Sequence, residues 1–164
     1  MEFEDDAFVL SARAHGEAGA IVELLTARHG RYAAHVAGGG SRKMKPFLQP
    51  GAAVIARFRA RAPDQLGSAV LEPVGEGPAA LFDDRLGLAG LSAAAAVAAG
   101  ALREREPHPG AYLAFEALSR ALADPDIWPA VFVRFEAGLL QDLGFGLDLS
   151  KCAATGAVDD LIYV

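Results

Sequence analysis

The spacing of apolar residues changes near residue 77, and this change constrains the fold more than any other feature of the sequence. Before Gly75-Glu76-Gly77-Pro78 the apolar runs are short and are separated by turn signals. After it, apolar residues recur at helical spacing in longer segments. We therefore expect two domains, a strand-rich one over residues 1–77 and a helical one over residues 78–164.

Five apolar runs make up the first part, each bounded by Gly, Pro or Asp residues such as those of Pro50-Gly51. The expected strands are residues 7–13, 20–26, 31–37, 53–61 and 68–74. Five short strands with loops of this size predict a small closed or partly closed β-barrel.

Three helices are expected in the second part. An Ala-rich helix is predicted over residues 81–102, and aromatic and Leu residues recur at helical spacing over 112–122 and 128–143. Asp124-Pro125-Asp126 offers an N-cap for the last helix, and Gly144 ends it. The fold class is thus α+β. Residues 161–164 resemble the start of a strand that either joins the sheet or continues in a longer protein.

Composition excludes several classes of protein. The Ala-rich segment 86–102 is short and only weakly hydrophobic, which favours a buried helix over a membrane span. The acidic N-terminus lacks the features of a signal peptide, so we expect a cytoplasmic protein. Cys152 is the one cysteine and can form neither an internal disulfide nor, by itself, a zinc site. No metal and no cofactor are expected.

No residue pattern indicates catalysis. The four histidines lie far apart in the sequence and form no metal-binding pair at helical spacing. The serines lack the surroundings of a nucleophile elbow, and no paired carboxylates suggest acid–base chemistry. We therefore expect that the protein is not an enzyme.

Positive charge is concentrated in one block. Between Glu23 and Asp64 the chain has eight basic residues and no acidic one, although its net charge is −6. The eight are Arg28, Arg31, Arg42, Lys43, Lys45, Arg57, Arg59 and Arg61. A polyanion such as a nucleic acid is the first candidate for a ligand, because each neutralised phosphate releases condensed counterions.

Two parts of this block each have a second interpretation. Arg57, Arg59 and Arg61 share one face of the expected strand, about 6.6 Å apart, and could follow successive phosphates. Alternatively, their charges protect an edge strand from aggregation. The glycine-rich loop over residues 38–45 lets the backbone approach a phosphate closely, but it could also be an ordinary solvated loop.

Arg134 lies in the most aromatic helical segment, between Phe132 and Phe135. One interpretation is a salt bridge to Glu136 or to a neighbouring helix. The other is an anchor for the acidic or terminal carboxylate of a partner protein, beside an apolar groove.

Several short motifs occur in a characteristic order. They are residues 7–13 followed by His15-Gly16-Glu17, then His29-Gly30-Arg31, Leu48-Gln49-Pro50-Gly51, Arg134-Phe135-Glu136, Leu143-Gly144-Phe145-Gly146, Cys152-Ala153 and Thr155-Gly156. In these motifs the chain resembles the RecO family of bacterial recombination mediators and DNA repair proteins. The resemblance runs over essentially the whole sequence.

The resemblance implies an N-terminal OB-fold, a C-terminal helical domain and an association with the nucleoid. It implies binding of single- and double-stranded DNA, annealing of complementary strands and partnership with RecR. It also implies docking of the acidic C-terminal tail of single-stranded DNA-binding protein, so that RecA can be loaded. Some family members bind zinc through several cysteines, which this chain lacks. Members also continue beyond the equivalent of Val164, so we expect a shortened form.

Combining the charge pattern with the resemblance gives two sets of candidate residues. The expected DNA contacts are Arg13, Arg31, Arg42, Lys43, Lys45, Arg57, Arg59 and Arg61. The expected contacts to the partner tail are Arg134, Phe135 and Phe132. Two alternatives stay open, a protein adaptor whose basic surface binds an acidic protein and a barrel that binds a small molecule.

Overall fold

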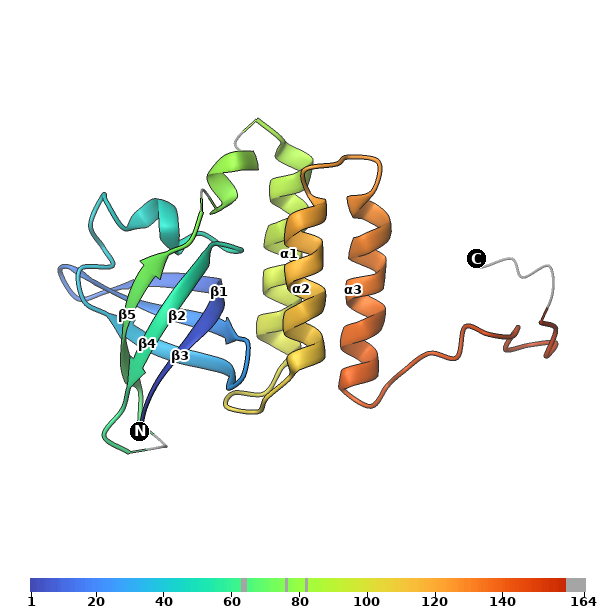
Figure 1. Ribbon diagram of the computed structural model, residues 1–164, viewed down its shortest axis with the longest axis horizontal. Helices are drawn as coiled ribbons and strands as arrows, with labels where there is room; N and C mark the ends of the chain where they lie inside the picture. Colours follow the sequence, from blue (N-terminus) through green and yellow to red (C-terminus); the bar gives the residue numbers. More distant parts are fainter. Residues whose placement is uncertain (63–64, 76, 82, 159–164) are drawn as a thin grey trace.

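The computed structural model describes residues 1–62, 65–75, 77–81 and 83–158. It shows a five-stranded β-barrel followed by three α-helices, which confirms the expected α+β fold (Figure 1). The strands are β1 (Glu2–His15), β2 (Gly19–Thr26), β3 (Gly30–Val36), β4 (Ala53–Arg59) and β5 (Gly67–Pro73). The helices are α1 (Arg85–Ala101), α2 (Pro109–Ala121) and α3 (Trp128–Asp142), with short 3-10 helices η1 (Lys45–Leu48) and η2 (Gly77–Leu81).

The barrel has the strand order β1-β2-β3-β5-β4 and is closed by pairing of β4 with β1. All neighbouring strands are antiparallel except β3 and β5, which run parallel over a short stretch. This strand order and the single parallel pair are those of an OB-fold. The division of the chain into domains at residue 77 stays a prediction.

Strand β1 belongs to both parts of the protein because its two faces are both buried. Ala7 and Val9 point into the barrel core, whereas Phe8 and Leu10 pack among the helices. The register of β1 against β2 shifts between Val9 and Ser11, as expected for a β-bulge that bends the strand. The bend allows one strand to close the barrel and to carry the helical domain.

The helices form a second core on the outer face of β1. Figure 1 shows α1 and α2 beside the barrel and α3 farther away from it. Phe115 and Phe135 of α2 and α3 are almost fully buried in this core and contact each other edge to face. Of the helices in the described ranges, none combines the length and the hydropathy needed to cross a membrane.

The ends of the helices follow their local sequence, with one exception. The side chain of Asp84 caps α1 by accepting hydrogen bonds from the N–H groups of Leu86 and Gly87. Gly144, with a φ of 84°, ends α3 as predicted. The predicted N-cap of α3 is wrong, because Asp124 accepts a hydrogen bond from Asp126 in the preceding turn instead.

Two further expectations differ from the structure in extent or lie outside it. Strand β1 begins at Glu2, five residues before the predicted start, because its acidic first half pairs with β4. The strand expected over residues 161–164 lies outside the described residues.

Candidate nucleic-acid interface

The basic loop between β3 and β4 lies beside the far end of β1. Arg13 of β1 and Lys45 of η1 line the same hollow, which has a volume of about 360 Å³ and includes Gly39 and Gly40 in its wall. A Cβ atom on Gly39 would come within 2.8 Å of the Ala20 side chain, so a glycine is needed where the loop passes β2. The structure thus brings Arg13 next to a loop that is about 30 residues away in sequence.

The basic side chains at this end of the barrel are exposed and unpaired. Within the described ranges, the side chains of Arg13, Arg42, Lys43 and Lys45 form no ion pair or hydrogen bond. We call these four residues the loop surface. Exposed cations of this kind are available to an anionic ligand, because no internal carboxylate has to be displaced, and two of them, Arg13 and Lys45, line the hollow.

The arginines of β4 are in a different situation. They alternate with core residues as predicted, but each faces carboxylates of neighbouring strands. Arg57 forms ion pairs with Glu4 of β1 and, at 2.9 Å, with Glu72 of β5, and Arg59 pairs with Glu2 at 3.1 Å.

The patch around the arginines of β4 is not cationic. It has two positive and three negative formal charges, those of Arg57, Arg59, Glu2, Glu4 and Glu72. The ion pairs are solvent-exposed, so each contributes little to the stability of the fold. A phosphate group could therefore bind Arg57 or Arg59 only by competing with the carboxylates that already pair with them. Arg61 lies just beyond β4 and is exposed.

Arg31 connects the barrel to the helical domain through a hydrogen bond. Its Nε donates a hydrogen bond to the carbonyl of Leu102 at 2.9 Å, and a terminal nitrogen pairs with Glu23 at 3.0 Å. Its side chain is only 17% exposed. We therefore leave Arg31 out of the DNA contacts, where the charge pattern had put it.

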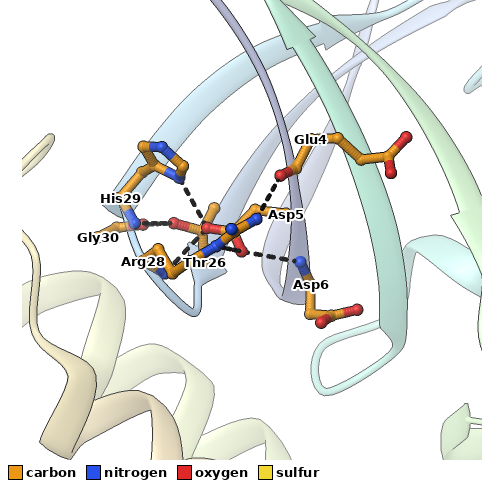
Figure 2. A network of polar contacts seen from close by, with 7 residues as sticks. All are labelled: Glu4, Asp5, Asp6, Thr26, Arg28, His29 and Gly30. Atoms are coloured by element: carbon orange, nitrogen blue, oxygen red, sulfur yellow. Dashed lines mark hydrogen bonds and ion pairs between the residues drawn. The ribbon is translucent and has the colours of Figure 1, made fainter.

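Arg28 belongs to a polar network that closes the other end of the barrel (Figure 2). Its Nε and its backbone N–H both donate to the carboxylate of Asp5, which also contacts His29 Nδ1 at 2.7 Å. The ring of Phe3 stacks on His29 with centroids 3.9 Å apart. Thr26 bonds to the carbonyl of Gly30 and completes the turn between β2 and β3.

Asp5 is the centre of this network, and its side chain is 1% exposed. Burial raises the pKa of the Asp5 carboxyl, but the hydrogen bonds from His29 and Arg28 outweigh burial, so the pKa lies below its ordinary value. The same carboxylate raises the pKa of Arg28. The network holds the turn between β2 and β3 in place. Arg28 therefore has a structural role in the fold.

We expect Asp5→Asn to lower the free energy of unfolding by about 2 kcal/mol, because an amide cannot accept all the hydrogen bonds that the carboxylate accepts. Urea unfolding at neutral pH measures this loss. The matched control is Asp6→Asn, which changes the same charge on the exposed neighbour and should alter stability by less than about 0.5 kcal/mol. Equal effects of the two changes would contradict the role of Asp5.

The same comparison should depend on pH. Because the pKa of Asp5 is lower in the folded state, the carboxylate contributes its full stability above the ordinary value of 3.8, and loses it as the pH falls below that value. The difference in stability between the wild type and Asp5→Asn should therefore shrink in acid. A constant difference down to pH 2 would show that the charge of Asp5 is not responsible.

The three residues expected to bind a partner tail are in unlike surroundings. Arg134 is exposed and makes no ion pair with any residue in the described ranges, so the predicted alternative of a bridge to Glu136 is not observed. Phe132 is half-buried and contacts Trp128. Phe135 is 1% exposed in the helical core. Because its side chain belongs to the core, we leave Phe135 out of the proposed contacts to the tail.

Sequence reasoning also missed residues around the loop surface. His15 and His35 lie with their ring centroids 5.7 Å apart at the same end of the barrel as Arg13. The one hint in the sequence is Gly19, because a glycine at this position leaves room for the ring of His35. In the described part of the chain no three His, Cys, Asp or Glu side chains come together as a metal site. Cys152 lies half-exposed in a turn, outside both cores.

Comparison with known proteins gives matches over both parts of the chain. Residues 1–72 match the family model described as Recombination protein O N terminal, and residues 83–164 match that described as Recombination protein O C terminal. DNA repair protein RecO of Phenylobacterium zucineum is 84% identical over all 164 residues of this chain, which cover 68% of the relative.

More distant relatives match over the same length. DNA repair protein RecO of Caulobacter vibrioides strain NA1000 is 75% identical, and that of Roseobacter denitrificans is 48% identical. In both comparisons the whole chain is matched and covers 68% of the relative. With an OB-type barrel, a helical domain and matches to both family models, the chain belongs to the RecO family of DNA repair proteins.

Proposed function

We propose that this protein acts in DNA repair and homologous recombination by binding single- and double-stranded DNA and annealing complementary strands. The observation that carries the proposal is the loop surface, four exposed cations that have no partner among the described residues, two of which, Arg13 and Lys45, line a hollow at the end of an OB-type barrel. Annealing brings two negatively charged strands together, and a cationic surface lowers their repulsion without covalent chemistry. The proposal places the protein in the cytoplasm, at the nucleoid.

The partners follow from the family and from the helical domain. We propose that the protein works with RecR and helps to load RecA onto strands coated by single-stranded DNA-binding protein. Arg134 supports this proposal, because a guanidinium that is exposed on α3 and has no partner among the described residues suits the carboxylate of an acidic tail.

Fluorescence anisotropy of a labelled single-stranded oligonucleotide, titrated across a salt series, tests DNA binding. Contacts to four phosphates predict a slope of about −3 in a plot of log K against log salt, taking roughly 0.7 per phosphate. Absence of binding even at low salt would overturn the proposal for this chain.

The second candidate function is that of a protein adaptor. Exposed apolar residues on and after α3, such as Val133 and Phe145, favour a protein partner for this side of the molecule. An adaptor would bind an acidic peptide ending in a free carboxylate and would bind no oligonucleotide at any salt concentration. Binding of both ligands would favour the first proposal, in which DNA and the tail each bind this chain.

A further inference from the structure

One row of residues crosses all five strands on the outer face of the barrel. Arg13 of β1 is paired in register with Ile21 of β2, Ile21 with His35 of β3, His35 with Ser68 of β5, and Ser68 with Arg59 of β4. Residues paired in register point to the same side of a sheet. With strands about 4.8 Å apart, the row is roughly 19 Å long. We call it the cross-strand row.

His35 is the middle residue of the row, and the ring of His15, which pairs with Gly19 outside the row, lies next to it. The rings of His15 and His35 meet edge to face above Gly19, with centroids 5.7 Å apart. A Cβ atom at position 19 would lie 2.4 Å from His35 Nε2, although the backbone there does not require a glycine. Gly19 is therefore needed for space, and it lets the His35 ring lie next to His15.

Of the described acids near the row, Glu23 and Glu2 are paired, whereas Glu17 is exposed in the turn between β1 and β2, two residues from His15. Glu23, the nearest acid on β2, accepts hydrogen bonds from Ser11 and Arg31 through both of its oxygens. At the β4 end, Glu2 pairs with Arg59. A hollow of about 390 Å³ lies at this end and is lined by residues that include His35, Ser68 and Arg59.

The row continues directly from the loop surface, because Arg13 belongs to both. It offers imidazole and hydroxyl groups between two guanidinium groups. Ring N–H groups and hydroxyls donate hydrogen bonds to phosphate oxygens, and imidazole faces stack on nucleobases. A length of roughly 19 Å is enough for a few nucleotides of an extended single strand.

From this arrangement we propose that a DNA single strand leaves the loop surface at Arg13 and crosses the barrel along the cross-strand row, with His15 and His35 as its middle contact. This inference rests on the proposed DNA binding and assigns the path of the strand. The ion pair between Glu2 and Arg59 opens where the strand ends, which costs at most about a two- to five-fold change in affinity for an exposed pair.

Chemical modification of histidine tests the path without altering the protein. The protein, saturated with a single-stranded oligonucleotide as shown by anisotropy, is treated with diethyl pyrocarbonate, and each histidine is followed by mass spectrometry. DNA should slow modification of His15 and His35 and leave His29 unchanged, because His29 lies at the opposite end of β2 in the Asp5 network. Saturated binding without protection would overturn the path alone, whereas absence of binding would overturn the proposed function as well.

Variants give a second test. Replacing both histidines with alanine should weaken single-strand binding about five-fold or more, as for loss of one stacked base. His35→Arg adds one charge on the row and should steepen the salt slope by about 0.7. The control Gln141→Arg adds the same charge on the exposed side of α3. Equal slopes for the two arginine variants would contradict the path.

Discussion

Replacing Phe135 with alanine is expected to lower the free energy of unfolding by about 3 to 5 kcal/mol, the usual cost of a large cavity in a core. The side chain is 1% exposed and packs against Phe115 with ring centroids 5.9 Å apart. It also contacts Phe132 on the same helix. Small domains are stable by only about 5 to 15 kcal/mol, so this single change removes a large share of the total. Urea unfolding followed by circular dichroism measures it.

The neighbouring Arg134 provides the control. Arg134→Ala alters an exposed side chain that has no partner among the described residues, so it should change stability by less than about 0.5 kcal/mol. It should nevertheless weaken binding of an acidic peptide that ends in a free carboxylate. A stable Phe135→Ala protein would show that the helical core does not depend on this ring.

Helical spacing of apolar residues predicted the three helices, and short apolar runs between turn signals predicted the five strands, in which apolar and polar residues can alternate. Burial imposes that alternation directly, as in β4, where Val54, Ala56 and Phe58 enter the core while Arg57 and Arg59 stay outside. The end of α3 could also be predicted from the local sequence, because Gly144 has the positive φ that favours glycine.

The partners of the arginines could not be predicted in this way. Glu2 and Glu4 precede the apolar run of β1, and acidic residues have a low preference for strands, so the strand was expected to begin later. Pairing with β4 overrides that preference and places each carboxylate opposite an arginine. Which cation meets which acid depends on strand register, and register is set by the closed barrel rather than by any local pattern.

Arg31 shows the same limit over a longer distance. Its acceptor is the carbonyl of Leu102, which lies 71 residues farther along the chain. The charge block was therefore a valid sign of a cationic surface but overestimated its extent. The structure divides it into residues with internal partners, such as Arg28, Arg31 and Arg57, and residues with none in the described part of the chain, such as Arg42 and Lys43.

This division leads to the largest functional effect that we expect. Replacing all four residues of the loop surface, Arg13, Arg42, Lys43 and Lys45, with alanine should flatten the salt dependence of single-strand binding by about 3 units, at roughly 0.7 per phosphate. Between 50 and 200 mM salt, the wild type should then lose much more affinity than the variant. Anisotropy with one labelled oligonucleotide at several salt concentrations measures both slopes.

A matched variant separates position from net charge. Four exposed cations of the helical side, Arg103, Arg120, Arg134 and Lys151, are replaced with alanine, which changes the net charge by the same amount. This variant should keep a slope within about one phosphate contact of the wild type, because its cations do not lie on the loop surface.

Arg57→Ala tests whether the patch around the arginines of β4 also contacts DNA. Two carboxylates already pair with Arg57, and its removal leaves them unpaired at the surface. The slope should therefore change little, although the loss of one positive charge lowers affinity slightly at low salt. If Arg57→Ala flattened the slope as much as the removal of a loop cation, DNA would be displacing Glu4 and Glu72, and the interface would extend along β4 from Arg59 to Arg57. The comparison of the two fourfold variants has its own contrary outcome. If both flattened the salt dependence by the same amount, binding would follow net charge alone, and the loop surface would not be the site.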